Sequence, residues 1–251
     1  MKKIIFLTVG LALIASQAMA ASINFTSGLT QGEFKSLSKE AGGAISYKNV
    51  APAEPLGLTG FDVGVEVSAI DIKTGGNNYW DRAFNGDAPS YLFIPKIRAR
   101  KGLPFGIDLG ASYAYVPDSN IKLYGAELSK AILEGSAITP ALGIRATYTK
   151  LAGVKDLDLQ TAGIDASISK GFFILTPYAG VGAVYVMSKA TGDLQKYSPA
   201  VNGGAPLSSE KFWQPRGFAG VKISPFPLFG ITAEVEYEVR PIYTLKAALS
   251  F

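Results

Sequence analysis

The last residues of the chain alternate strictly between apolar and polar side chains. In the stretch IYTLKAALSF every second residue is apolar, and these residues are Tyr243, Leu245, Ala247, Leu249 and Phe251. The same alternation precedes it in FGITAEVEYEV, where the polar face carries Glu234, Glu236 and Glu238. A period of two predicts a strand with one apolar face and one polar face.

This pattern recurs along most of the chain. It predicts ten strands, at residues 61–72, 91–100, 105–116, 121–132, 138–150, 157–170, 173–187, 212–224, 229–239 and 243–251. Each has roughly the 9–11 residues that a tilted strand needs to cross a bilayer. Because lipid offers no partner to an open sheet edge, such strands must close. We expect an all-β fold, a closed antiparallel transmembrane β-barrel of about ten strands over residues 61–251. The count is open by two, since segment 44–50 and loop 188–211 offer further candidates.

The expected connections differ in length at the two ends of this barrel. If the first strand runs outward from the periplasm, the inner connections are short, near residues 103 and 171 and at 133–137 and 225–228. The two long connections, 74–90 and 188–211, then share the outer end. Long outer loops and short inner turns are typical of bacterial outer-membrane barrels.

Aromatic residues of the expected apolar face sort by type. Phenylalanine occupies the inner strand ends, at Phe61, Phe105, Phe173, Phe229 and Phe251. The outer ends carry Tyr91, Tyr113, Tyr115, Tyr148, Tyr185, Trp213, Tyr237 and Tyr243. Amphipathic rings prefer the headgroup level of a bilayer, so this sorting predicts two girdles. A soluble secreted β-sandwich is the alternative for alternating strands, but it gives no reason for the sorting.

The first twenty residues have the pattern of an export signal. Lys2 and Lys3 precede an apolar stretch, and Ala18 and Ala20 have the A-x-A spacing of a cleavage site. We expect a signal peptide over residues 1–20, because the apolar run is shorter than a membrane-spanning helix needs. The sequence contains no cysteine, so lipoprotein anchoring is not expected.

Charge balance argues against one class of partner. Loss of the two lysines of the signal peptide leaves 22 basic and 20 acidic residues. A nearly balanced chain gives no electrostatic reason to bind nucleic acid.

The C-terminal stretch YTLKAALSF resembles the assembly signal of Gram-negative outer-membrane β-barrel proteins. The resemblance rests on Tyr243, Leu245, Leu249 and the terminal aromatic residue Phe251. It implies recognition by the barrel-assembly machinery and insertion among the lipids of the Gram-negative outer membrane. It identifies no subfamily.

Residues 21–60 follow a different pattern and are expected to form a periplasmic segment. Thr30 and Glu33 have capping-box spacing, and a helical apolar stripe follows at Phe34, Leu37 and Ala41. We expect a short helix ending at Gly42 and Gly43, then a brief strand at 44–50. The segment could lie under the barrel, enter its lumen, pack at its rim or be a loosely ordered leader. We favour contact with the periplasmic mouth.

The polar faces of the strands predict a charged lumen. Its expected charges are Glu66, Lys96, Arg98, Arg100, Glu127, Arg145, Asp165, Arg216, Lys222, Glu234, Glu236, Glu238 and Arg240. Side chains nearly fill a barrel of about eight strands, and ten is close to that number. We expect the basic row at 96–100 to neutralise the acidic row at 234–238 across the lumen. A narrow polar conduit is the alternative.

The sequence argues against catalysis. It contains no histidine, so a Ser-His-Asp triad, a His-bearing metal site and a His-Asp pair are all impossible. Glu234 and Glu236 could form a carboxylate pair, but they suit lumen ion pairs better. No phosphate loop or dinucleotide fingerprint is present, so we expect no enzyme, metal site or cofactor.

Two functions remain from different classes. One is a structural or surface-interaction barrel, whose outer loops contact an external ligand or surface through residues such as Tyr79 and Trp80. The other is a narrow pore or facilitator for small polar solutes. Single-channel conductance separates them.

Overall fold

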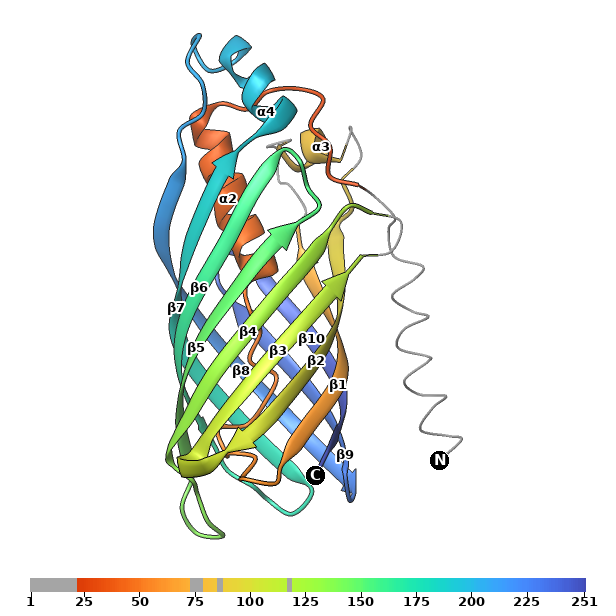
Figure 1. Cartoon of the computed structure of the whole chain (residues 1–251), viewed down its shortest axis with the longest axis vertical. Coiled ribbons are helices and arrows are strands. Elements are labelled where there is room, and N and C mark those ends of the chain that lie inside the picture. Colours follow the sequence, from red (N-terminus) through yellow and green to blue (C-terminus); the bar gives the residue numbers. More distant parts are fainter. Residues whose placement is uncertain (1–21, 73–78, 85–87, 117–118) are drawn as a thin grey trace.

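The computed structural model describes residues 22–72, 79–84, 88–116 and 119–251, so the expected signal peptide lies outside the described residues. Ten antiparallel strands form a closed barrel (Figure 1). They are β1 (Phe61–Asp71), β2 (Tyr91–Leu103), β3 (Ile107–Tyr115), β4 (Lys122–Leu133), β5 (Ala141–Ala152), β6 (Leu157–Ser169), β7 (Leu175–Ala190), β8 (Glu210–Phe226), β9 (Phe229–Tyr237) and β10 (Pro241–Ser250). The expected number of strands and their closure are confirmed.

Each strand pairs with its neighbours in the chain, and β1 pairs with β10 to close the ring. Val65 lies opposite Ala247 across this closing contact. The short connections and the C-terminus lie at one end of the barrel, called here the turn end (Figure 1). The opposite end, called the loop end, carries the short helices α3 (Tyr79–Ala83), α4 (Gly192–Tyr197) and η2 (Ser198–Ala200).

Part of the expected inner girdle is wrong. Phe105 lies in the turn η1 (Pro104–Gly106) and Phe173 lies in the turn before β7, each with positive φ. Both rings therefore project from turns and not from strands. Phe229 keeps the outward register of its strand, opposite Leu249, but its side chain is covered and only 7% exposed. Phe61 and Phe251 do contact each other, with ring centroids 5.6 Å apart.

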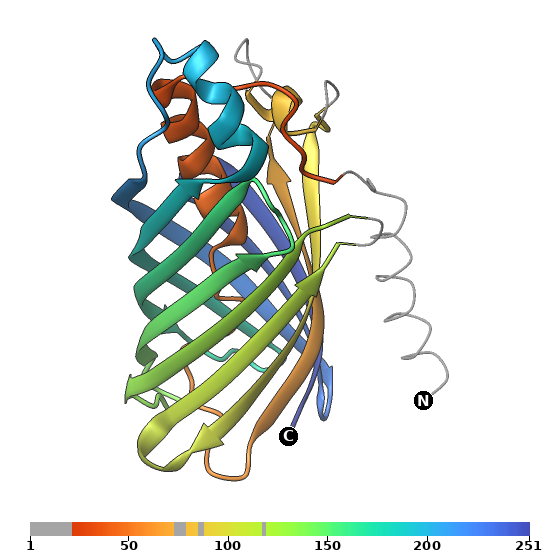
Figure 2. The same cartoon turned by 45° about the horizontal axis from the view of Figure 1, so that its top comes forward.

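The helix α2 (Gln31–Ile45) lies inside the barrel, in the half next to the loop end (Figure 2). The Thr30–Glu33 capping box is present as expected. The expected stop at Gly42 and Gly43 is wrong, because the helix continues to Ile45. Residues 44–50 form no strand in the part of the chain that the structure describes, so that expectation is wrong too.

Residues 46–60 run from the end of α2 through the barrel to the turn end (Figures 1 and 2). The backbone N–H groups of Ala53 and Leu56 donate to Ser169 Oγ and Asp108 Oδ1, each at 3.0 Å. Residues 51–60 therefore contact the barrel at the turn end; that this end is the periplasmic one stays a prediction. The expected contact with the mouth is wrong for the helix, which occupies the lumen near the other end.

The barrel interior has two layers. Near the loop end, inward residues such as Ile70, Ile94, Leu159 and Val186 form an apolar core with α2. Nearer the turn end, the inward residues are charged and buried. Within the described ranges, no helix combines the length and apolar character needed to cross a membrane.

Candidate functional site

The charged layer of the lumen contains most of the charges expected from the sequence. The buried members are Glu66, Lys96, Arg98, Arg100, Glu127, Arg145, Asp165, Arg216, Glu234, Glu236 and Glu238. Lys222 is half-buried at the turn end, and Arg240 is half-buried at the loop end beside α2. Asp62, Asp108 and Lys246 belong to the same buried layer and lie on the polar faces of their strands, as the alternation implies.

One cluster of ion pairs joins β1 to β4. Arg98 Nε lies 2.9 Å from Glu66 Oε2, and Arg98 Nη1 lies 3.5 Å from Glu127 Oε2. Arg100 Nε lies 2.5 Å from Glu127 Oε1, and Lys96 Nζ lies 3.5 Å from Glu66 Oε1. These pairs link β2 to β1 on one side and, across β3, to β4 on the other, so each buried charge has an opposite charge beside it.

A second cluster lies on the facing wall. Arg145 Nη2 is 2.6 Å from Asp165 Oδ2, and Arg216 Nε donates to Asp165 Oδ1 at 2.6 Å. Arg216 Nη1 also lies 3.5 Å from Glu236 Oε2. Asp165 therefore pairs with two guanidinium groups, from β5 and β8, and Arg216 connects this cluster to the glutamates of β9.

Between the two clusters runs the luminal segment, residues 46–50. The ammonium of Lys48 lies 2.7 Å from Glu236 Oε1. Ser46 Oγ donates to Glu238 Oε1 at 2.6 Å, and the N–H of Val50 donates to Glu234 Oε2 at 2.8 Å. All three glutamates of the acidic row therefore bind the luminal segment.

Arginines of the barrel hold the same segment from the other side. The carbonyl of Lys48 accepts from Arg98 Nη2 at 2.9 Å and from Arg145 Nη1 at 3.0 Å. The carbonyl of Tyr47 accepts from Arg216 Nη1 at 2.8 Å, and the Arg98 guanidinium lies 4.3 Å from the Tyr47 ring centroid. The segment thus binds opposite walls of the lumen at once.

This arrangement corrects the expected neutralisation across the lumen. No ion pair of the described residues joins the row 96–100 directly to the row 234–238. Lys48 stands between them, and the basic row pairs with acids on β1, β3 and β4. The sequence analysis did not single out Lys48, because it sorted charges only within strands.

A cavity of about 210 Å³ remains in the lumen near the turn end. Residues 50–52 and 54–56 line one side, and Lys222, Lys246 and Asp62 are among its other lining residues. Lys246 Nζ lies 2.5 Å from Asp62 Oδ1. The space is polar and has room for small solutes only.

At the loop end, the carboxylate of Glu40 on α2 accepts hydrogen bonds from three side chains. Tyr79 Oη donates to Glu40 Oε1 at 2.8 Å, and Trp80 Nε1 donates to Glu40 Oε2 at 2.6 Å. Arg240 Nε donates to Glu40 Oε1 at 2.9 Å, and this bond raises the Arg240 pKa. Burial, followed by the bond to Glu40, raises the pKa of Tyr79 to about 12.

The expected exposure of Tyr79 and Trp80 is therefore wrong. Their exposed fractions are 5% and 2%, because both belong to α3 and pack onto α2. The aromatic and amide residues around Tyr79 and Trp80 are typical both of an exposed loop and of a segment that packs inward, so composition could not distinguish the two. The partner that shows the difference, Glu40, lies in a distant part of the chain.

The carboxylates of β9 have structural partners. Glu234 accepts from Tyr178 Oη at 2.8 Å as well as from Val50, and Glu236 binds Lys48. The described residues contain no group of three or more His, Cys, Asp or Glu side chains placed to hold a metal ion. The geometry therefore supports a role in holding the luminal segment.

Comparison with known proteins gives structural neighbours only. No family model matches the chain, and no curated protein matches it. The outer membrane protein OprG from Pseudomonas aeruginosa is 9% identical over 80% of this chain and 99% of its own, with a TM-score of 0.38. The N-terminal β-barrel domain of Pseudomonas aeruginosa OprF is 12% identical (76% and 97%, TM-score 0.36). The Yersinia pestis outer membrane protein Ail is 15% identical (77% and 99%, TM-score 0.35).

These neighbours are outer-membrane β-barrels. A solved KdgM porin is also among them, at 9% identity over 76% of this chain and 99% of its own, with a TM-score of 0.36.

Proposed function

We propose that this protein is an integral barrel of the Gram-negative outer membrane whose lumen is closed by its own N-terminal segment. In this proposal the loop end faces the cell exterior, and the barrel has a structural or surface-interaction role. The observation that carries it is the occupied lumen. Helix α2 and the luminal segment occupy most of the interior, and the luminal segment binds charged groups on both walls.

A belt of exposed apolar side chains supports the membrane location. These side chains point outward from strands around the ring, and they include Val63, Ile97, Leu109, Leu128, Ile144, Ile164, Val181, Val235 and Leu249. A soluble monomer rarely exposes a continuous apolar surface of this extent. The hydrocarbon tails of lipids would cover the belt without burying polar groups that lack hydrogen-bond partners.

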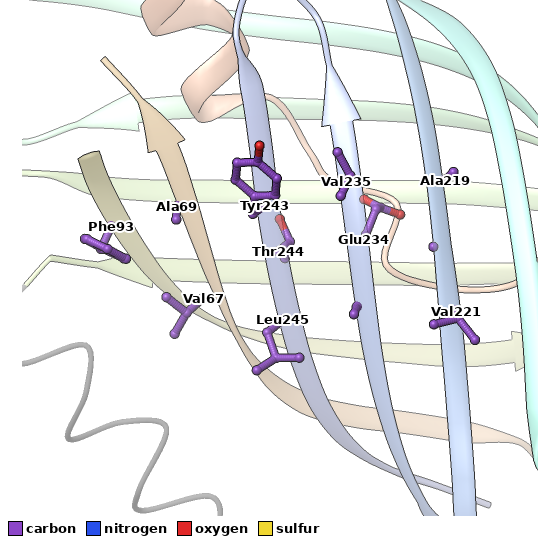
Figure 3. A pocket seen from close by; sticks show the side chains of 12 residues that line it. Val67, Ala69, Phe93, Ala219, Val221, Glu234, Val235, Tyr243, Thr244 and Leu245 are labelled. Carbon is purple, nitrogen blue, oxygen red and sulfur yellow. The ribbon is translucent and has the colours of Figure 1, made fainter. Parts of the chain in front are cut away.

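The outer surface also has a hollow that suits lipid. It has a volume of about 710 Å³ and is lined by β1, β2, β8, β9 and β10 (Figure 3). Val67, Phe93, Val235 and other apolar side chains line it, and Glu234 and Thr244, which also border it, are themselves buried. An acyl chain can fill such a hollow without hydrogen bonds.

Desolvated charges favour a closed lumen over a conduit. A buried ion pair is stable only when its partners stay in place, since an unpaired buried charge is costly. Lys48 and Glu236 are almost completely enclosed, so water does not hydrate them. Passage of a solute would have to displace the luminal segment and break several of these contacts together.

The test has two steps. Protein purified from outer membranes should migrate faster on a gel before heating than after it, as a folded barrel does. In planar bilayers it should then be electrically silent. Discrete channel openings would overturn the closed lumen and favour a narrow pore for small polar solutes. A processed protein that is monomeric without detergent would overturn the membrane location.

We also propose that the protein is not an enzyme and needs no cofactor. Its sequence lacks histidine, and the luminal carboxylates bind structural partners. Export by a signal peptide and recognition of residues 243–251 by the barrel-assembly machinery stay predictions. We propose an external ligand or surface as the partner of the loop end.

A further inference from the structure

Four lysines occupy outward positions where strands approach the loop end. They are Lys122 on β4, Lys150 on β5, Lys189 on β7 and Lys211 on β8. Each side chain is exposed, and none takes part in an ion pair or hydrogen bond within the described ranges. We call these four residues the basic patch.

The strand register groups the basic patch into two pairs. Lys122 lies opposite Ala152, so Lys150 is its diagonal neighbour. Lys211 lies opposite Met187, so Lys189 is its diagonal neighbour. Diagonal neighbours of a sheet are about 7–8 Å apart. The midpoints of the two pairs are three strand spacings apart, about 14 Å along the sheet, and the nearest members, Lys150 and Lys189, are two spacings apart.

Aromatic residues lie directly below three of these lysines. Tyr124 is two positions from Lys122, Tyr148 two positions from Lys150, and Trp213 two positions from Lys211, each on the same outward face. Amphipathic rings favour the headgroup level of a bilayer. The ammonium groups therefore lie at or just beyond that level, where lipid phosphates are found.

The basic patch is confined to one side of the barrel. The corresponding outward positions on the described parts of β9, β10, β1, β2 and β3 hold no lysine or arginine, but instead Tyr237, Tyr243, Asp71, Tyr91 and Tyr115. The one acidic side chain within the patch is Asp158, opposite Lys189, and it accepts from Gln160 Nε2 at 3.3 Å. Four cations thus face one carboxylate.

We propose that the basic patch binds the headgroup of an outer-leaflet lipid that carries two phosphate groups. Each lysine pair would contact one phosphate, and the acyl chains would lie along the apolar belt below. Lysine is a common phosphate ligand, and basic residues near a membrane surface favour anionic lipid. The inference rests on the proposed function, because it requires the barrel to span a bilayer.

The protein carries its own probe for this site. It has two tryptophans, of which Trp213 is 58% exposed next to Lys211 and Trp80 is 2% exposed in the interior. Lipids with brominated chains quench tryptophan fluorescence on contact. Quenching of Trp213 by brominated cardiolipin, which has two phosphates, can be compared with quenching by brominated phosphatidylcholine, which has one and no net charge. Trp213→Phe identifies the signal.

The variant K122Q/K150Q/K189Q/K211Q removes the basic patch. A control with the same charge loss, K35Q/K39Q/K155Q/K196Q, removes four exposed lysines that lie outside the strands at the same end. We expect the wild-type barrel to prefer cardiolipin by about tenfold or more at low salt, since each lysine near an anionic surface contributes roughly 1 kcal/mol, about a fivefold factor. The patch variant should lose that preference to within about twofold, and the control should keep it.

The outcomes separate this inference from the proposed function. Quenching of Trp213 by phosphatidylcholine without a preference for cardiolipin overturns the lipid site alone. An equal loss of preference in both quadruple variants overturns it as well, because net charge would then explain the effect. Absence of quenching by either lipid, in a protein that remains folded by gel shift, overturns the membrane location itself.

Discussion

Lys48 is the residue on which the charged lumen depends most directly. Its ammonium donates to the carbonyl of Gly43 at 2.6 Å and to Ser46 Oγ at 2.8 Å, and it pairs with Glu236. An ammonium group has three donors and no acceptor, so these three partners satisfy it completely. The surrounding lumen leaves it no access to water.

We predict that Lys48→Met destabilises the folded barrel by about 3–5 kcal/mol, because it leaves Glu236 buried without its nearest cation. Lys48→Met combined with Glu236→Gln should recover a large part of this loss, since the double variant leaves no unpaired charge from this pair. Urea unfolding in detergent micelles, followed by gel shift, measures both. A single variant as stable as wild type would contradict the role of Lys48.

The titration of Tyr79 makes the free energy of unfolding depend on pH in the alkaline range. Its folded-state pKa is about 12, above the ordinary value of 10.0, because burial and Glu40 both disfavour the phenolate. The unfolded chain releases this proton near pH 10, while the folded protein keeps it until about pH 12. The free energy of unfolding therefore falls as the pH rises between these values.

The measurement compares wild type with Tyr79→Phe. Wild type should lose more stability between pH 10 and pH 12 than the variant, in urea unfolding at fixed ionic strength. Tyr197→Phe is the matched control, because Tyr197 is an exposed tyrosine of α4 at the same end. Identical pH dependence in wild type and Tyr79→Phe would show that Tyr79 titrates normally.

The strands were the most predictable elements of this chain. Alternation predicts a strand well where one face meets an apolar environment and the other meets charges. In β9, Glu234 and Glu236 lie on one face and Val235 lies on the other. The alternation fails at strand ends. The strand expected from residue 138 begins at Ala141, because Ser136 and Thr139 form a hydrogen-bonded turn there.

The sequences of the strands also indicate where α2 lies. Near the loop end, the inward residues change from charged to apolar, as at Ile70, Leu92, Ile94 and Val184. An inward apolar layer requires an apolar object within the barrel, and the amphipathic segment 31–45 is the one nearby candidate in the sequence. Combining the two patterns would have placed the helix inside the barrel and away from the turn end.

Gly42 allows α2 to pack closely against β7. A Cβ atom at this position would lie 2.6 Å from Val186 Cγ2, well inside contact distance. Val186 is β-branched and fully buried, so it cannot turn aside easily. We predict that Gly42→Ala costs about 1–3 kcal/mol, even though alanine is the better helix former.

Gly32 of the same helix provides the control, since a Cβ there meets nothing within 4 Å. Gly32→Ala should be neutral or stabilising by up to about 1 kcal/mol. Adding Val186→Ala to Gly42→Ala should restore part of the lost stability by giving the new methyl group room. Equal effects of the two glycine variants in urea unfolding would contradict the close packing of α2.

At the scale of the whole molecule, the N-terminal residues are attached to the loop end. The N–H of Ile23 donates to Asn120 Oδ1 at 3.0 Å, and the N–H of Leu29 donates to Ser198 Oγ at 3.1 Å. From there the chain passes through the lumen and leaves at the turn end before β1 (Figure 1). Sequence reasoning could not find this path, because its contacts join residues far apart in the chain, 50 positions for Lys48 and Arg98 and 97 for Ile23 and Asn120.

Single cysteines can report this path, because the native chain has none. Ser27 is exposed at the loop end, and Glu54 is exposed near the turn end. With the proposed orientation, a maleimide polymer too large for outer-membrane pores should label Ser27→Cys on intact cells. It should label Glu54→Cys only after the outer membrane is permeabilised. The reverse result would mean that the barrel is inserted in the opposite direction.

The contact between β1 and β10 has a consequence for biogenesis. It closes a ring around a chain that is itself continuous with one of the two joining strands. Residues 22–60 must therefore take their place inside the barrel before β1 and β10 pair. A compact folded domain fused ahead of residue 22 should therefore prevent the pairing of β1 with β10. An unstructured epitope tag at the same place should allow it.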